Sequence, residues 1–247
     1  ELESKLNSSL HLGNIGIGHT RWATHGEPNQ VNAHPHSDSK GKFSLIHNGI
    51  IENHYAIKEF LIKEGINFNS DTDTEVLVQF MGYLYDKKNL SFFDALRLTL
   101  KEVVGAYGIV AVCQDEPDKI IAARNGSPLV LGLGKDENFV GSDISAIMEY
   151  TRNILYLDDG EIVEITKDGY IGINEGTPDR RLHLKDPAQI KLESTATGNW
   201  SGLQFMASSG TNNYDAYMGM QDSDGIFFID NNNNGHDFTI DRSGYIK

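Results

Sequence analysis

The residues that could do chemistry gather in three short polar blocks, 19–26, 46–53 and 70–75. Between them the blocks supply a guanidinium, carboxylates, a side-chain amide and a glycine backbone N–H. Such groups can hold an amino acid by both of its ends and can stabilise an oxyanion. The first two blocks adjoin apolar runs at 15–18 and 43–46. That arrangement is typical of buried strands that hold reactive groups on a rigid scaffold.

The elements that must position these blocks are predicted from apolar periodicity and from residues that favour helix ends. Ser70 or Asp71 is expected to cap a helix that follows it, and Ser91 with Asp94 resembles a capping box for the next helix. The predicted helices are 55–64, 72–85, 91–104 and a short one at 145–150. The predicted strands are 14–22, 43–51, 107–112, 119–124, 128–133, 138–140, 154–157 and 161–165.

Four motifs in order carry a resemblance to a known family: HTRWATHG (19–26), AHPH (33–36), HNGIIEN (47–53) and SDTDTE (70–75). They closely resemble the glutaminase domain of the glutamine–fructose-6-phosphate aminotransferase family. That domain is a class II glutamine amidotransferase of the N-terminal-nucleophile hydrolase type. The resemblance continues through later blocks and fades near Thr166: 105–108, 122–124, 126–130 and 141–143.

The resemblance implies an α+β fold in which two sheets lie between helix layers, a four-layer αββα sandwich that is incomplete at the N-terminus. Residues 1–165 are expected to form this N-terminally truncated amidotransferase domain. It also implies a function, in which the complete domain hydrolyses the side-chain amide of L-glutamine and supplies ammonia for glucosamine-6-phosphate synthesis. No cofactor is implied.

The same resemblance assigns roles to residues that match the family's motifs. The Asn48 side chain and the Gly49 backbone N–H would form the oxyanion hole, Arg21 would bind the glutamine α-carboxylate, and Asp73 would bind the α-ammonium. A loop that closes over glutamine would contain Trp22, Thr24, His25 and Gly26. Taken without the motifs, these residues have simpler interpretations: an Asn-Gly hairpin turn, a surface arginine, a helix-cap carboxylate and a core tryptophan.

The family's nucleophile is an N-terminal cysteine whose own α-amine serves as base, and it lies ahead of the stretch with which this chain starts. The sequence has one cysteine, Cys113, inside the apolar run 109–113. We predict that Cys113 is a packed thiol in a buried strand. The chain as it stands is therefore expected not to turn over glutamine, and whether it is an enzyme stays open at this point.

Composition changes after Thr166, where Gly, Asn, Asp and Ser separate short runs of alternating polarity. These runs predict a small all-β segment over 166–247. The sequence of this segment resembles segments of phage tail-fibre proteins, which often become stable as trimers. The alternative function is thus a viral or phage fibre-like structural protein that carries a catalytically dead amidotransferase-derived module. It would be virion-associated, whereas the enzyme would be cytoplasmic.

Charge and composition limit the classes of partner and ligand that the chain is expected to bind. A net charge of −14 argues against nucleic acid, since phosphate binding needs clustered Lys and Arg. No apolar run approaches the length of a membrane span. Nine histidines do not fall at a recognisable metal-ligand spacing. One late segment resembles a calcium loop through Asp230, Asn232, Asn234 and Asp241, although an Asn-rich hairpin turn between 226–229 and 238–240 is the favoured interpretation.

Overall fold

The computed structural model describes residues 13–20 and 26–178, together with the backbone of later strands between 182 and 240. The chain forms two compact units, Glu1–Ala188 and Gln189–Lys247. No helix among the described residues is long and apolar enough to cross a membrane.

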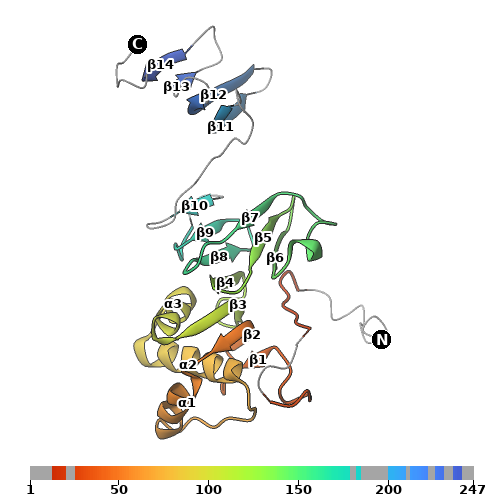
Figure 1. Cartoon of the computed structure of the whole chain (residues 1–247), viewed down its shortest axis with the longest axis vertical. Coiled ribbons are helices and arrows are strands. Elements are labelled where there is room, and N and C mark those ends of the chain that lie inside the picture. The colour runs from red at the N-terminus through yellow and green to blue at the C-terminus, as the bar shows by residue number, and fades with distance from the viewer. Residues whose placement is uncertain are drawn as a thin grey trace. The chain divides into compact units, whose positions relative to one another are not determined.

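The first unit is built on a seven-stranded sheet (Figure 1). Neighbouring strands in it are antiparallel, except for the parallel pair at its far edge. In spatial order the strands are β1 (His36–Ser37), β2 (Phe43–Ile51), β3 (Gly105–Cys113), β4 (Lys119–Asn125), β8 (Ile162–Thr166), β9 (Ile171–Ile173) and β10 (Leu182–Leu184).

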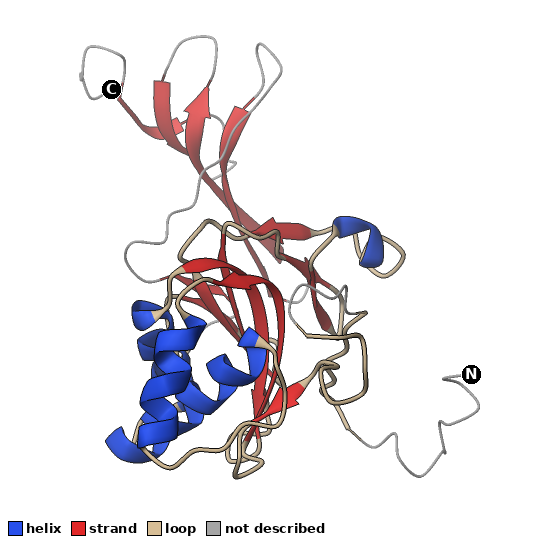
Figure 2. Ribbon diagram, turned by 60° about the horizontal axis from the view of Figure 1, so that its bottom comes forward, coloured by secondary structure: helices blue, strands red, loops and turns tan. Residues whose placement is uncertain are grey.

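Three helices lie on one face of this sheet (Figure 2): α1 (His54–Lys63), α2 (Asp73–Lys88) and α3 (Phe92–Glu102). All three were predicted from apolar spacing. Ser91 caps α3 by accepting a hydrogen bond from the Asp94 N–H, as predicted. The cap of α2 was predicted wrongly, because Thr72 accepts from the Glu75 N–H while Ser70 donates its hydroxyl to the Glu75 carboxylate.

The core between the sheet and the helices follows the alternation along β2. Phe43 and Leu45 are fully buried against the helices, and His47 continues the same face. Ile46 faces the opposite side, where it packs against a second core. Consecutive residues of β2 therefore serve two different layers.

A second sheet of three strands supplies the next layer: β6 (Asn138–Gly141), β5 (Val130–Leu133) and β7 (Ile154–Tyr156). Leu131 of β5 packs with Val110 and Val163 of the large sheet, so the two sheets lie face to face. The described residues thus form a helix layer and two sheet layers of an α+β sandwich.

Two local predictions were wrong. Residues 14–20 form no strand, although Ile17 still packs against the core between the sheets. The short helix predicted at 145–150 is a single 3₁₀ turn, η2 (Ile144–Ala146), followed by further turns. Ile15 and Ile17 are only partly buried, and within 145–150 only Ile147 is buried while Met148 and Tyr150 are exposed, so the apolar spacing did not indicate a regular element in either place.

The large sheet continues beyond residue 166, where the sequence suggested that the first domain ends. β9 pairs with β8, and Gly176 approaches α3 so closely that a Cβ there would lie 2.6 Å from Phe93 Cγ. Residues 166–178 consequently fold with the first unit.

The second unit contains a four-stranded antiparallel meander: β11 (Trp200–Ser209), β12 (Asn212–Gln221), β13 (Ile226–Asp230) and β14 (His236–Ile240). This agrees with the predicted all-β character of that part of the chain. Ile229 pairs with Phe238, as expected for strands joined by a hairpin turn. Of the calcium-loop candidates, Asn232, Asn234 and Asp241 lie outside the described residues, as does the side chain of Asp230.

Candidate functional site

A pocket of about 700 Å³ opens in the first unit, and three of the predicted site residues, Asn48, Gly49 and Asp73, line it. Its walls come from segments that are far apart in the sequence. They are Gly18–Thr20, His34, Ile46–Gly49 of β2, Thr72–Thr74 at the start of α2, Gly108 and Val110 of β3, Leu129, Val140–Ser142 and Ala146.

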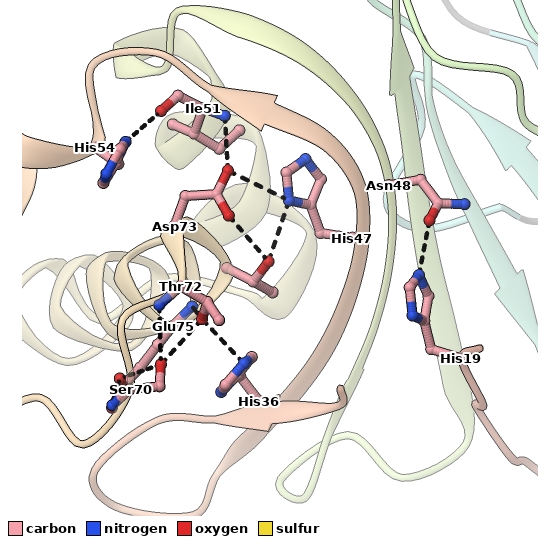
Figure 3. A network of polar contacts seen from close by, with 11 residues as sticks. His19, His36, His47, Asn48, Ile51, His54, Ser70, Thr72, Asp73 and Glu75 are labelled. Carbon is pink, nitrogen blue, oxygen red and sulfur yellow. Dashed lines mark hydrogen bonds and ion pairs between the residues drawn. The ribbon is translucent and has the colours of Figure 1, made fainter. Parts of the chain in front are cut away.

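Consecutive residues of β2 point to opposite sides of the strand (Figure 3). His47 is buried toward α2, where its Nδ1 lies 3.2 Å from Thr74 Oγ1 and 3.9 Å from Asp73 Oδ2. Asn48 points the other way, and its Oδ1 lies 2.7 Å from His19 Nε2. The strand alternation therefore places His47 beside Asp73 and Asn48 beside His19, and all four residues line the same pocket.

Gly49 lies inside β2 and pairs with Tyr107 of β3, so the Asn48-Gly49 pair is not a hairpin turn. Its φ is +133°, which an L side chain rarely adopts. A Cβ at this position would lie 2.0 Å from the Ala106 carbonyl oxygen. Only glycine fits this close approach of β2 to β3.

Asp73 is the first residue of α2 and is 3% exposed. Its Oδ2 accepts a hydrogen bond of 2.8 Å from the Ile51 N–H. Oδ1 has a single long contact among the described residues, 3.5 Å from Thr74 Oγ1. Oδ1 therefore keeps the capacity to accept from a cation in the pocket.

The turn before Asp73 is held by a buried carboxylate that sequence reasoning did not single out. Glu75 accepts bonds from the N–H groups of Asn69 and Ser70, at 2.9 and 2.6 Å, and from the Ser70 hydroxyl at 2.6 Å. Thr72 Oγ1 lies 2.9 Å from His36 Nε2. These contacts fix the backbone that carries Asp73.

A second connection, also missed from the sequence, passes through Asn32, which is 2% exposed. Its Nδ2 donates to the Glu27 carbonyl oxygen and its Oδ1 accepts from the Asp71 N–H. Gly26 packs against it with a positive φ of 72°. Asn32 therefore ties the chain just after the predicted closing loop to the turn that bears Asp73.

The other predicted residues are placed as follows. Gly26 is described but is not among the residues that line the pocket. Arg21, Trp22, Thr24 and His25 lie outside the described residues. Cys113 is buried on β3, away from the pocket lining, and burial raises the pKa of its thiol.

The histidines around the pocket engage one another and the chain. The rings of His19 and His34 lie 4.5 Å apart, and those of His34 and His36 lie 5.2 Å apart. Within the described part of the chain, no group of three metal-ligating side chains comes together. The arrangement suits hydrogen bonding to a polar organic molecule.

The family model described as "Glutamine amidotransferase domain" matches residues 7–177. The chain is 51% identical over 192 residues to the glutamine–fructose-6-phosphate aminotransferase of Clostridium tetani, covering 78% of this chain and 29% of that protein. It is 52% identical over 156 residues to the Caldanaerobacter subterraneus enzyme of the same name, covering 63% and 25%. The chain thus spans less than a third of the length of these relatives.

Two solved structures share the fold. They are the Bacillus subtilis glutamine phosphoribosylpyrophosphate amidotransferase complexed with ADP and GMP, and a structure described as the allosteric regulatory enzyme of purine biosynthesis. Their TM-scores are 0.53 and 0.54 at 24% and 23% identity, and each match covers 66% of this chain and 36% of the other. They confirm the expected sandwich.

The comparisons give no support to the tail-fibre resemblance of residues after 166, which stays a prediction. The family match, in contrast, covers the described pocket, the three-stranded sheet and the large sheet as far as β9. This chain belongs to the glutamine amidotransferase domain family.

Proposed function

We propose that the pocket binds L-glutamine and that the domain hydrolyses the glutamine side-chain amide to glutamate and ammonia. The observation that carries this proposal is the convergence of Asn48, Gly49 and Asp73 on one cavity of about 700 Å³. Asp73 Oδ1 receives the α-ammonium of the substrate. The Asn48 amide N–H and the Gly49 N–H donate to the carboxamide oxygen as it becomes an oxyanion.

The chemistry needs a nucleophile that the family resemblance places at an N-terminal cysteine ahead of Glu1. Its thiol attacks the carboxamide carbon, its α-amine takes the thiol proton and passes a proton to the departing ammonia, and water then cleaves the thioester to give glutamate. Cys113 does not serve, because its thiol is buried outside the pocket and burial raises its pKa.

The substrate's other contacts follow from the matched motif. Arg21 binds the α-carboxylate through its planar guanidinium. A loop made of Trp22, Thr24, His25 and Gly26 closes over bound glutamine and excludes water. Asn32 anchors the C-terminal end of this loop through its bond to the Glu27 carbonyl oxygen.

The proposed acceptor of the ammonia is fructose 6-phosphate, because relatives that are 51% and 52% identical to this chain are named for that transfer. The sugar-phosphate site would lie in the part of those proteins that this chain does not match. The proposed setting is the reducing cytoplasm, since the one cysteine within these 247 residues, Cys113, is a buried free thiol.

The test uses the protein with its complete natural sequence and measures glutamate release from L-glutamine. Asp73→Ala should raise KM by roughly tenfold to a hundredfold, because it removes a charge-assisted bond to the ammonium. Arg21→Ala should act in the same way. Asp71→Ala is the matched control, since this exposed carboxylate lies in the same turn and does not line the pocket.

Unchanged kinetics in Asp73→Ala would refute the assignment of the pocket. A fragment limited to residues 1–247 should bind L-glutamine weakly by calorimetry, because it would lack the N-terminal cysteine that the family resemblance implies. Micromolar affinity would contradict that expectation.

A further inference from the structure

We infer that His19 is a positioning residue that fixes the orientation of the Asn48 amide and thereby aims the amide nitrogen at the reacting carboxamide. This inference rests on the proposed function. It starts from the 2.7 Å contact between His19 Nε2 and Asn48 Oδ1, which joins residues 29 positions apart (Figure 3).

The contact defines the proton arrangement. Asn48 Oδ1 can only accept a hydrogen bond, so His19 Nε2 must carry the hydrogen. The other half of the amide, Nδ2, is then the half left to donate within the pocket. A primary amide rotates between two nearly equivalent orientations, and the wrong one would present Oδ1 to the oxyanion, where like charges repel. The bond from His19 selects the productive orientation.

The environment of His19 favours the tautomer that this role needs. His19 Nδ1 is buried and makes no hydrogen bond among the described residues. A neutral ring with its hydrogen on Nε2 leaves only a lone pair at Nδ1. The opposite tautomer, or a doubly protonated ring, would bury an N–H without an acceptor. The His34 ring, 4.5 Å away and tilted by 47°, packs against His19 and restricts its rotation.

Two proposed functions depend on β2, and His19 contacts the residue that serves only one of them. His47 contacts Asp73 and Thr74 on the helix side, where the ammonium of the substrate would bind. His19 contacts Asn48 on the opposite side of the strand, where the carboxamide would react. Loss of His19 should therefore affect the chemical step and leave substrate affinity nearly unchanged.

The experiment measures glutamate release by the protein with its complete natural sequence, carrying His19→Leu, His19→Gln, Asn48→Ala or the pair His19→Leu with Asn48→Ala. His19→Leu should lower kcat by roughly tenfold to a hundredfold, with KM changed less than about threefold, since one oxyanion donor is worth roughly 10²–10³ in kcat. His19→Gln, which restores an N–H donor, should recover part of the loss. The double variant should be no slower than Asn48→Ala.

His36→Leu is the matched control, because it also removes an imidazole near the pocket, one whose Nε2 lies 2.9 Å from Thr72 Oγ1 on the turn that carries Asp73. It should change KM more than kcat. A general-base role for His19 would instead make His19→Leu lose a limb of the pH profile of kcat that the wild type shows, with no recovery in His19→Gln, and that result would overturn the inference.

A second measurement does not depend on activity. The imidazole ¹⁵N shifts of His19, assigned by comparison with His19→Gln, should show the hydrogen on Nε2. A hydrogen on Nδ1 would overturn the inference while the proposed function stands. The same holds if the double variant lost kcat by the product of the losses in His19→Leu and Asn48→Ala. A wild-type protein that releases no glutamate from glutamine would refute the proposed function and this inference with it.

Discussion

Gly49→Ala should destabilise the protein by about 2–6 kcal/mol, because two separate costs meet at this position. The left-handed φ of +133° costs an alanine roughly 1–3 kcal/mol. In addition, the new Cβ would start 2.0 Å from the Ala106 carbonyl oxygen and 2.7 Å from its carbon, so β2 and β3 must move apart. Forcing extra atoms into a packed region costs typically about 1–3 kcal/mol.

Two control variants separate the costs. Gly65→Ala sits after α1 at φ +87° with no atom within 4 Å of the new Cβ, so it reports the φ cost alone. Gly105→Ala combines φ +137° with a Cβ placed 2.1 Å from the Ile50 carbonyl oxygen, yet Gly105 does not line the pocket. Gly105→Ala should match Gly49→Ala in stability and should retain glutaminase activity that Gly49→Ala loses.

The assay follows urea unfolding of the first unit by fluorescence and circular dichroism. The unfolding curves of all variants are analysed with a common m-value. Glutamate release from the complete natural protein is measured in parallel under conditions where each variant is folded. If Gly49→Ala cost no more than Gly65→Ala, the described approach of β2 to β3 would be refuted. If Gly105→Ala abolished activity as completely as Gly49→Ala, loss of activity would reflect the strand pair rather than the Gly49 N–H.

Three further variants test the supports of the site. Glu75→Gln should destabilise the protein by roughly 2–4 kcal/mol, because an amide N–H₂ would face the N–H donors of Asn69 and Ser70. Urea unfolding at pH 7 measures the change, and a loss under about 1 kcal/mol would contradict the hydrogen bonds described for Glu75. Asn32→Ala should cost roughly 1–3 kcal/mol and raise KM for glutamine, and an unchanged KM would show that the bridge does not support the site. Burial raises the pKa of Glu164, with Lys119 opposing the shift, so the folded state holds this proton to a higher pH than the unfolded state does. The stabilising contribution of Glu164 is thus fully present below its pKa in the unfolded state and is lost as pH rises through its pKa in the folded state. Glu164→Gln should flatten that decline in stability. An unaltered profile of stability against pH would refute the raised pKa of Glu164.

The sequence predicted what is set by nearby residues. The three helices follow from apolar spacing, and the Ser91 cap follows from a local capping pattern. Asn48, Gly49 and Asp73 were found through their motifs, and the structure brings them to one pocket. Their roles stay predictions until the kinetic tests.

What the sequence missed depends on contacts between distant residues. The bond from His19 to Asn48 spans 29 positions, and Asn32 meets Asp71 across 39. No local pattern marks either pair, because each contact forms only when the fold brings two distant segments together. The cap of α2 was misassigned for a related reason: Ser70 lies among several cap-competent residues, and the demand of the buried Glu75 carboxylate decides which of them bonds to what.

His47 and Asn48 point to opposite sides of β2 (Figure 3), so the register of β2 against β3 decides which side chains reach each side of the strand. Deleting one residue between Phe43 and Ile46 would turn every later side chain of the strand to the other face if the pairing upstream held. The imidazole next to Asp73 and the amide next to His19 would then exchange sides. A change in chain length by one residue should consequently disable both ends of the pocket together, whereas substitution of a single side chain disables one.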